Sequence, residues 1–428
     1  MLKPQINDLL TQTGPGTAMG AVFRSYWLPV LLAEELPEPG SPPVRAKVLS
    51  ERLIAFRDDD GNYGLIDEFC PHRGVSLWFG KNEGNGLRCA YHGWKFDVGG
   101  NCLEVPSEPP ESRFCEKITV ASYPLVRIGD LLWTYMGDPN EQPPLPEWEF
   151  AQVPADQTFT SKRWQESNWL QAMEGGIDSS HVSWLHSGGL KSDPLFKGAK
   201  GNEYNMSDMR PFFEVADADG GLFIGARRNA EEGHYYWRIT PFVLPSFTMV
   251  PPRGDHPVHG HFWIPIDDEN CWVYTFDYHP IRPLTPGERQ AMKDGHGVHN
   301  EHEPGTFRPL QNKDNDYMMD RDAQRRGETF SGVKGIAMQD ASLQESMGPI
   351  VDRSKERLVS TDTGIIKARQ KLRRAAEQLR DHGITPPGVD PDHQRVRSAA
   401  VVLPKDEDFI VACREMLKVQ PGVRQASV

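Results

Sequence analysis

Two short segments, each carrying one cysteine and one histidine, constrain this chain more than any other feature. The segments are Cys70-Pro-His72 and Cys89-Ala-Tyr-His92, and sixteen residues separate His72 from Cys89. Thiolates favour ferric iron, and neutral imidazoles raise the reduction potential of an iron–sulfur cluster above that of an all-cysteine cluster. The spacing therefore predicts a [2Fe–2S] cluster with one iron held by the two cysteines and the other by the two histidines.

The residues around these segments indicate two loops at the tip of a small antiparallel sheet. Glycines interrupt any helical period there, and Gly84-Asn85-Gly86 is a turn signal. A structural zinc site is the alternative, since the same four side chains could surround a tetrahedral ion. Zinc sites usually place two to four residues between their first two ligands, so the single residue between Cys70 and His72 favours the mixed-ligand cluster, known as a Rieske cluster.

The composition places the rest of the chain among acidic globular proteins. With 428 residues, 38% of them hydrophobic and 25% charged, the chain is long enough for two or three domains. Its net charge of -13 disfavours a nucleic-acid partner. The first apolar run, residues 27–33, is short and contains a proline, so it is expected to be neither a signal peptide nor a membrane span. The other cysteines lack paired spacing and are expected as free thiols in a reducing cytoplasm: Cys102, Cys115, Cys271 and Cys413.

Turn signals and hydrophobic alternation divide the chain into two parts. Residues 45–130 show short alternating runs, among them an expected hairpin with strands at 53–56 and 63–66. The proline-rich stretch 139–146 breaks every regular element and indicates a linker. We therefore expect an all-β domain with an N-terminal extension and linker at 1–146, and a second domain at 147–428.

The second part is predicted to be an α+β domain. Alternation predicts strands at 221–228, 235–250, 259–265 and 271–278. Apolar residues at steps of three and four predict a helix over 364–380, with Thr363 as its N-cap and Gly383 after its end. A late helix laid across a curved antiparallel sheet would enclose a pocket.

A second group of chemically active side chains lies near the start of this domain. Asp178, His181 and His186 follow the pattern Asp-x2-His-x4-His. On a regular helix His181 and His186 lie about 140° apart, so the helix must distort or end between them if both bind one ion. Ser187-Gly188-Gly189 is suited to such an end. Two histidines and a later carboxylate would form the facial triad of a non-haem Fe(II) oxygenase. The alternative is a chance pair of histidines on a surface helix.

Together the two motifs resemble the oxygenase (alpha) component of the Rieske non-haem iron aromatic-ring-hydroxylating oxygenases, over nearly the whole chain. Further segments resemble the phthalate dioxygenase branch, which also contains chlorobenzoate and phenoxybenzoate dioxygenases and aryl O-demethylases. These segments are Gly14-Pro-Gly-Thr17, Asn168-Trp169, Phe330-Ser-Gly-Val-Lys-Gly335 and residues 339–348. The resemblance implies a catalytic domain of the helix-grip (START-like) kind, in which a curved antiparallel sheet surrounds helices.

The resemblance also implies the roles of the site residues. The cluster ligands would be Cys70, His72, Cys89 and His92. His181 and His186 would bind a mononuclear Fe(II) with a late aspartate, whose position Asp340 matches; Asp352 and Asp316 are alternatives. Asp178 would bridge His92 of the partner subunit to His181, which would orient both imidazoles and couple the two metal centres. A capping or solvated aspartate is the other interpretation.

The resemblance also implies an activity for this chain. An NAD(P)H-dependent reductase with a flavin and a plant-type [2Fe–2S] cluster would pass single electrons to the Rieske cluster. They would then cross a subunit boundary in a homotrimer to the iron, where O2 is used to hydroxylate or O-demethylate an aromatic carboxylate of the phthalate, chlorobenzoate, phenoxybenzoate or methoxybenzoate type. A Rieske-type electron carrier without oxygenase activity and a zinc-stabilised ligand-binding protein are the alternatives, and no membrane partner is expected.

Substrate binding has fewer sequence signals. An aromatic carboxylate would need a planar guanidinium at the pocket wall, and Arg210, Arg228 and Arg238 lie in or near the predicted sheet. Strand alternation puts Leu222, Ile224 and Ala226 on the face of Arg228, which suits either an amphipathic ligand or a core face that ends at solvent.

Three histidines at three-residue spacing resemble a further metal patch. His296, His299 and His302, with Glu301, lie in the long polar stretch 284–329 among glycines and a proline. That setting favours an exposed loop or lid over a metal site.

Overall fold

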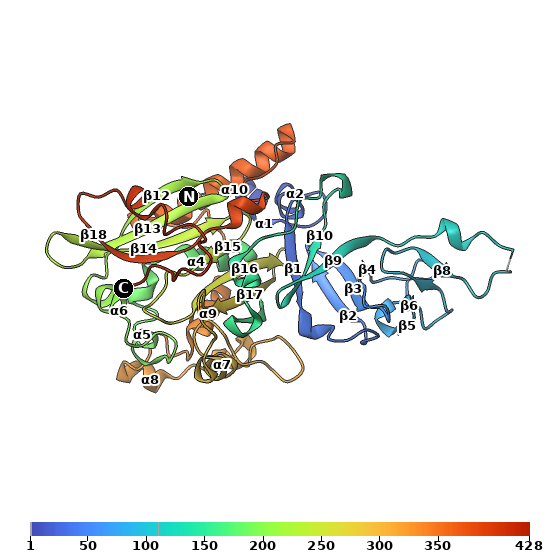
Figure 1. The fold of residues 1–428 in the computed structure, drawn as a ribbon, viewed down its shortest axis with the longest axis horizontal. Coiled ribbons are helices and arrows are strands. Elements are labelled where there is room, and N and C mark those ends of the chain that lie inside the picture. The colour runs from blue at the N-terminus through green and yellow to red at the C-terminus, as the bar shows by residue number, and fades with distance from the viewer. Residues whose placement is uncertain (1, 110) are drawn as a thin grey trace.

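Alternating apolar residues between tight turns build the N-terminal part as a six-stranded antiparallel sheet (Figure 1). The computed structural model describes residues 2–109 and 111–428. The expected hairpin is confirmed, with Ala55 of one strand opposite Leu65 of the next. In spatial order the strands are β1 (Trp27–Leu32), β10 (Leu131–Tyr135), β9 (Ser122–Ile128), β4 (Tyr63–Asp67), β3 (Glu51–Arg57) and β2 (Val44–Val48).

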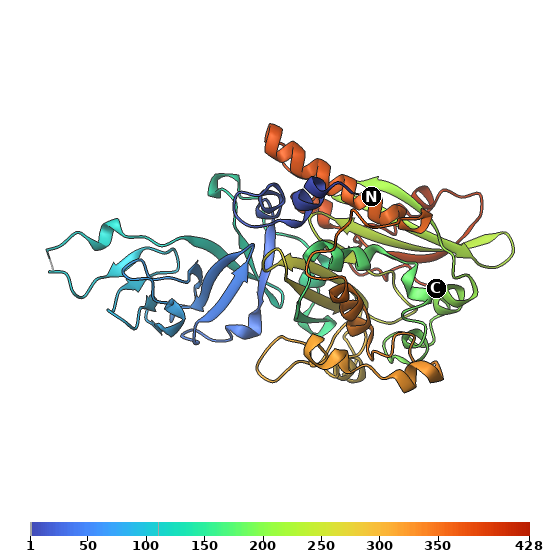
Figure 2. The same cartoon turned by 180° about the vertical axis from the view of Figure 1, so that it is seen from behind.

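A smaller four-stranded sheet extends this part to one far end of the molecule, as Figures 1 and 2 show from opposite sides. Its strands are β5 (Lys81–Glu83), β6 (Gly86–Arg88), β7 (Lys95–Phe96) and β8 (Cys102–Glu104). The two Cys/His segments lie in the loops before β5 and between β6 and β7, over a small apolar core that includes Leu77, Leu87 and Phe96. The all-β prediction for this part is thereby confirmed.

The second part is built on an eight-stranded antiparallel sheet. Its main path runs β11 (Thr158–Gln165), β17 (Cys271–Tyr278), β16 (Val258–Pro265), β15 (Phe247–Met249), β14 (His234–Val243), β13 (Gly221–Asn229) and β12 (Phe212–Ala218), and β18 (Ala399–Pro404) pairs with β14. One expectation was wrong: residues 235–250 form a hairpin of β14 and β15 instead of one strand. Pro245 lies at the turn, where it has no N–H to donate to a strand neighbour.

Helices pack on this sheet and complete the predicted α+β architecture. The long C-terminal helix α10 (Thr363–His382) buries Ala368, Leu372 and Ala376 and ends at Gly383 in a left-handed conformation (φ 65°), as expected. Its N-cap residue is Asp362, however, and Thr363 is already the first helical residue. The other helices are α1 (Pro4–Thr11), α2 (Ala18–Arg24), α3 (Glu149–Gln152), α4 (Trp169–Ile177), α5 (Gly189–Ser192), α6 (Gly201–Ser207), α7 (Pro286–Lys293), α8 (Arg321–Arg326), α9 (Ile336–Ser346) and α11 (Phe409–Cys413). Among the helices described, none is long and apolar enough to cross a lipid bilayer.

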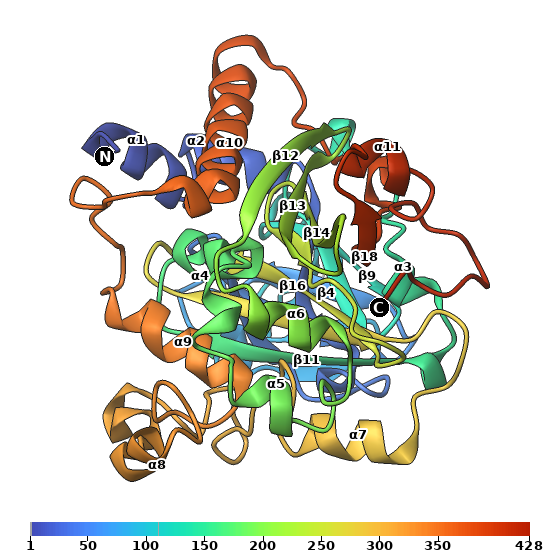
Figure 3. The ribbon, with the colours of Figure 1, turned by 90° about the vertical axis from the view of Figure 1, so that its left-hand side faces the viewer.

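The two parts share one continuous hydrophobic core. Buried residues of β1, β3 and β10 belong to the same cluster as those of α4, β16 and β17. Backbone bonds from Leu49 N–H to Pro265 O (2.8 Å) and from Ser50 N–H to Ile266 O (2.9 Å) join the β2–β3 turn to the β16–β17 turn. Helices α1 and α2 lie beside α10 (Figure 3), so the N-terminal extension packs on the second part of the chain. This shared packing holds the two parts in one orientation.

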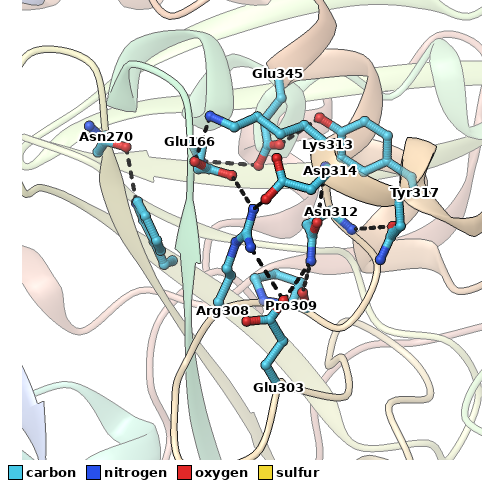
Figure 4. Close-up of polar contacts among 12 residues, drawn as sticks. Glu166, Asn270, Glu303, Arg308, Pro309, Asn312, Lys313, Asp314, Tyr317 and Glu345 are labelled. Atoms are coloured by element: carbon cyan, nitrogen blue, oxygen red, sulfur yellow. Dashed lines mark hydrogen bonds and ion pairs between the residues drawn. The ribbon is translucent and has the colours of Figure 1, made fainter.

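The stretch 284–329 is more ordered than the expected exposed loop, because it contains α7 and α8 and is tied to neighbouring elements. Arg308 pairs with Glu303 and Asp314, and Asn312 donates to Glu303 and Pro309 (Figure 4). Tyr317 Oη donates to Glu345 Oε2 of α9 at 2.7 Å. These contacts fix the stretch against the helix that carries Asp340.

Candidate metal centres and cavity

The two Cys/His loops have the same backbone construction. In the first, Cys70 N–H donates to Val75 O (2.9 Å) and Gly74 N–H to Cys70 O (2.8 Å). In the second, Cys89 N–H donates to Trp94 O (2.8 Å) and Gly93 N–H to Cys89 O (3.0 Å). Gly74 and Gly93 have φ values of 72° and 77°, a left-handed conformation that a residue with a Cβ rarely adopts. Each loop therefore turns sharply directly after its cysteine and brings its histidine to the tip.

The four side chains fit a mixed-ligand cluster. The side chains of Cys70 and Cys89 are buried, whereas His72 is exposed, His92 is half-buried and their ring centroids lie 4.4 Å apart. Burial raises the pKa of the Cys70 thiol to about 11, so a cation is needed to hold it as a thiolate. Two thiols and two imidazoles brought together in this way fit the ligands that a Rieske cluster requires.

The second motif departs from the helix on which sequence reasoning placed it. Helix α4 begins at its N-cap Asn168, whose Oδ1 accepts from Leu170 N–H (3.0 Å), and it ends at Ile177. Asp178 is extended (φ -93°, ψ 108°), and His181 begins a separate 3-10 turn. The helix thus ends before Asp178 instead of between the two histidines. This break frees both imidazoles to turn toward one point.

His181, His186 and Asp340 converge on that point. His181 Nε2 lies 3.2 Å from His186 Nε2 and 3.5 Å from Asp340 Oδ1, and His186 Nε2 lies 3.3 Å from Asp340 Oδ2. Two ligand atoms that each lie about 2 Å from an ion, at right angles to each other, are about 3 Å apart. The observed distances therefore fit three ligands on one face of a single ion. The alternatives Asp352 and Asp316 are both exposed and stand outside this group.

Each imidazole is held in one orientation by a partner on its other nitrogen. His181 Nδ1 is 3.2 Å from Asp178 Oδ2, and His186 Nδ1 is 2.8 Å from Gln339 Oε1. If each Nδ1 carries the proton, both Nε2 atoms present a lone pair to an ion. The sequence did not predict Gln339 as the partner of His186. The only feature that pointed to Gln339 is its position beside Asp340.

The charges of the site are mutually stabilised. Burial opposes ionisation of Asp340, but His186 and His181 outweigh it and lower the pKa to about 2. Burial likewise opposes the charge of His181, but Asp178 and Asp340 outweigh it and raise the pKa to about 9. For Asp178, hydrogen bonds from His181 and Ser180 overcome burial and lower the pKa. The carboxylates therefore stay ionised at neutral pH, as cation ligands must.

Replacing Gln339 with leucine should lower the affinity for iron about 10- to 100-fold, because the leucine removes the acceptor that orients His186. The measurement is the competition between this variant and a chelator of known affinity, with acid-labile sulfide as an internal control that should stay at the wild-type level. Iron retention equal to wild type would show that His186 does not need this hydrogen bond.

A cavity of about 80 Å³ opens beside these three side chains. Three arginines line it: Arg163, Arg238 and Arg253. Arg238 is 2% exposed, and its Nε and Nη1 have no hydrogen-bond partner among the residues that the structure describes. Arg253 Nη1 donates to Asn202 Oδ1 (2.5 Å). Of these three, only Arg238 is predicted from the sequence, because Arg163 in β11 and Arg253 in a loop lie outside the predicted strands.

The other two arginines predicted from the sequence lie outside the cavity lining. Arg210 is exposed, and Arg228 is buried with its guanidinium committed to Ser179 O (2.7 Å) and Asp208 O (3.1 Å). Leu222, Ile224 and Ala226 are buried on the face of Arg228, as alternation predicted. That face is therefore a core face whose terminal charge is satisfied by the protein itself.

The three histidines at three-residue spacing bind different neighbours. His299 is buried between Ser161 Oγ (2.7 Å) and Asp277 Oδ2 (2.8 Å), contrary to the expected exposure. His296 lies 3.5 Å from Asp193 Oδ2, and His302 Nε2 lies 3.0 Å from Lys162 O. Within residues 2–109 and 111–428, these three histidines do not converge on one point.

Comparison with known proteins supports the same pair of centres. The family model of the Rieske [2Fe–2S] domain matches residues 26–124, and that of the domain described as LigXa C-terminal domain like matches residues 134–421. The 3-chlorobenzoate-3,4-dioxygenase oxygenase subunit of Comamonas testosteroni is 36% identical over 426 residues, which cover 96% of this chain and 98% of that protein. The phthalate 4,5-dioxygenase oxygenase subunit of Pseudomonas putida is 37% identical over 382 residues, 87% of this chain and 85% of that protein.

Solved structures share the fold. The crystal structure of dicamba monooxygenase bound to 3,6-dichlorosalicylic acid has a TM-score of 0.59 at 19% identity, covering 84% of this chain and 98% of that one. The relatives use a Rieske cluster and a mononuclear non-haem iron, for which this chain has both sets of side chains. The chain therefore belongs to the Rieske non-haem iron oxygenases, as an oxygenase (alpha) component of the phthalate dioxygenase type.

Proposed function

We propose that this oxygenase component oxidises an aromatic carboxylate at an iron held by His181, His186 and Asp340. The proposed cluster ligands are Cys70, His72, Cys89 and His92. The division into a cluster domain at 1–146 and a catalytic domain at 147–428 is part of the same proposal. The observation that carries the substrate class is Arg238 in the cavity beside the triad, a buried guanidinium two of whose nitrogens have no partner within the described part of the chain.

The arrangement of the chain supports electron transfer between subunits. The cluster loops lie at the tip beyond β5 to β8, whereas α4 and α9, which flank the iron site, lie in the opposite part of the molecule (Figures 1 and 2). A route within one chain would have to cross the whole first sheet. We propose that chains assemble head to tail, as a homotrimer, so that the tip of one meets Asp178 of the next. The side chain of Asp178 is 20% exposed, which leaves an edge for His92 of the partner subunit.

An electron-donating protein completes the system. The oxygenase of carbazole 1,9a-dioxygenase, whose fold is similar at a TM-score of 0.54, has been solved in complex with a ferredoxin. We propose that this chain takes electrons from an NAD(P)H-dependent reductase that carries a flavin and a plant-type [2Fe–2S] cluster. The exposed aromatic rings near the cluster, Trp78, Phe79 and Tyr91, are suited to contact such a donor. The free cysteines support a reducing, cytoplasmic location.

The residues of this chain bind and orient the substrate. Arg238 would pair with the carboxylate, since a guanidinium fork matches both oxygens. Arg163 also faces the cavity; burial lowers its pKa, although the charge of Asp340 acts in the opposite direction. Val250, Ile336 and Trp263 supply apolar walls for a ring. When bound, the cluster supplies single electrons and the iron supplies the oxidation by O2.

Replacing Arg238 with glutamine should lower kcat/KM for a carboxylate substrate about 10- to 100-fold, because a charge-assisted hydrogen bond contributes about 1.5–3 kcal/mol. The assay is oxygen consumption with product analysis over phthalate, 3-chlorobenzoate, phenoxybenzoate and methoxybenzoate. Arg210→Gln, at an exposed arginine, is the matched control and should match wild type. An equal loss with the corresponding uncharged amides would assign Arg238 a structural role and remove the proposed carboxylate contact.

Metal analysis tests the proposal against its alternatives. The purified chain should contain about three irons and two acid-labile sulfides. An electron carrier would contain two of each, and a zinc-stabilised protein would contain neither. His186→Ala should lower the iron content by about one per chain and leave the sulfide unchanged. A coincident loss of sulfide would mean that the two centres are not separate.

A further inference from the structure

Two cysteines that the metal centres do not use lie in contact beside the cluster loops. Cys102 is in β8, and Cys115 begins a short 3-10 turn, residues Cys115–Lys117. Cys115 Sγ is 2.9 Å from Cys102 Sγ and 3.0 Å from Cys102 O. A disulfide bond is about 2.05 Å long, so an approach of about 0.9 Å would bring the two sulfurs to bonding distance. The sequence spacing, with twelve residues between them, gave no sign of this pairing.

Backbone contacts hold the two cysteines together. Cys102 N–H donates to Ile118 O (3.1 Å), Ile118 N–H donates to Cys115 O (3.0 Å), and Asn101 and Thr119 form a β-bridge. Both side chains are half-buried, so small reagents can reach them while the surrounding chain keeps them aligned. The remaining thiols outside the cluster, Cys271 and Cys413, are fully buried in other parts of the molecule.

We propose that Cys102 and Cys115 are a redox-active dithiol that forms a reversible intrachain disulfide. With oxidised glutathione as the oxidant, one protein sulfur displaces a glutathione thiol to give a mixed disulfide. The second protein sulfur then displaces the other glutathione. The two hydrogens of the protein thiols end on two glutathione molecules, so the protein loses two electrons and glutathione gains them. Burial raises the pKa of Cys102 to about 12, so exchange at neutral pH should take minutes to hours.

The position of this pair connects it to the cluster. Phe114, the neighbour of Cys115, packs edge-on against Trp94 with ring centroids 5.8 Å apart, and Trp94 stacks on His72 at 4.7 Å. Cys102 and Cys115 also pack against the apolar core that contains Cys70 and Cys89. A disulfide would move Cys115 and hence Phe114, so its formation should be felt at His72. The dithiol itself does not depend on the proposed function, whereas this coupling depends on His72 as a cluster ligand.

Peptide mapping of the holoenzyme tests the site. The protein is incubated with oxidised glutathione, quenched in acid, and alkylated in denaturant with N-ethylmaleimide. Cleavage after Lys95, Arg113 and Lys117 puts the two cysteines on separate peptides, 96–113 and 114–117. We expect these peptides to be joined, with a mass two hydrogens below their sum, and the alkylated cysteines to fall from the six of the reduced chain to four. Both peptides alkylated after overnight incubation would overturn the proposal.

Two variants separate this bond from general oxidation. Cys102→Ser should abolish the joined peptide, whereas Cys413→Ser, at a buried cysteine remote from the cluster, should keep it. Dithiothreitol should restore six alkylated cysteines in the wild type. A joined peptide between any other pair of cysteines would also overturn the assignment, and the wild-type map alone decides the question if Cys102→Ser does not fold.

A spectroscopic measurement tests the coupling. The circular dichroism of the visible cluster bands should differ between the dithiol and disulfide forms of the wild type and should be the same before and after oxidation in Cys102→Ser. Identical spectra of the two wild-type forms would overturn the link to His72. If the chain binds no cluster at all, the proposed function fails, yet the peptide map still reports whether the disulfide forms.

Discussion

Replacing Asp178 with asparagine is expected to leave both metal centres in place and to slow turnover about 10- to 100-fold. Asp178 is not among the three converging ligands, and the side-chain oxygen of an asparagine can still accept from His181, so iron and sulfide contents should stay near those of wild type. An asparagine has one acceptor oxygen in place of two and carries no charge. It can satisfy His181 or the N–H and O–H of Ser180, but it leaves no acceptor for an imidazole from another chain. Orienting partners of metal ligands typically contribute 10- to 100-fold.

The decisive measurement is the rate at which a pre-reduced cluster is reoxidised when substrate and O2 are added, because this rate reports transfer to the iron and not substrate binding. Ser180→Ala is the matched control, since it removes one donor to Asp178 and keeps the carboxylate. It should stay within a few-fold of wild type. If Asp178→Asn reoxidises its cluster at the wild-type rate, Asp178 is only a helix-terminal carboxylate and the route must lie elsewhere.

Replacing Glu174 with glutamine should cause the largest loss of stability, about 3–5 kcal/mol. Glu174 of α4 accepts from Arg369 Nε (2.6 Å) and Nη2 (2.9 Å) of α10 and from Arg353 Nη2 (3.2 Å). Arg353 is fully buried and loses its carboxylate partner once Glu174 is gone, whereas the nearly buried Arg369 keeps its ion pair with Glu356. The expected result is a Tm lower by several degrees in thermal unfolding followed by circular dichroism.

A surface ion pair as control, and the pH dependence of stability, distinguish this buried ion pair from an exposed one. Glu377→Gln removes the partner of Arg373 on the exposed side of α10 and should change stability by less than about 0.5 kcal/mol. Burial opposes ionisation of Glu174, but Arg353 and Arg369 outweigh it and lower the pKa. Its stabilisation is therefore complete above the unfolded-state pKa of about 4.3 and is lost as the pH falls toward the lower folded value. A difference between wild type and Glu174→Gln that grows as the pH falls below 4 would contradict this assignment.

The loops of the proposed cluster site could be predicted from the sequence because the candidate ligands are local. Each loop supplies a cysteine and a histidine within three or four residues, and Gly74 and Gly93 mark the turns. The iron site could be predicted in part. His181 and His186 are five residues apart, whereas Asp340 comes from a distant helix, and only the resemblance selected it from the other late aspartates.

Substrate-binding residues could not be predicted in the same way, because alternation gives the face of a strand but not what lies above it. Arg228 and Arg238 lie on adjacent strands and are both buried, yet Arg228 is used by Ser179 and Asp208 while Arg238 faces the cavity. Arg163 belongs to β11 and Arg253 to a loop, so only the folded sheet brings them together. The end of α4 before Asp178 could not be predicted, because no glycine or proline directly follows Asp178.

The hydrophobic core that runs without interruption from the first sheet into the second makes each chain a single stiff body. A hinge motion between the two sheets would have to break the backbone hydrogen bonds from Leu49 and Ser50 to the β16–β17 turn. The distance from a cluster to the iron that it serves is consequently not adjustable inside a polypeptide. In the proposed head-to-tail assembly, this distance would be set by how whole chains are placed against their neighbours, so the spacing between the two metals would belong to the quaternary arrangement.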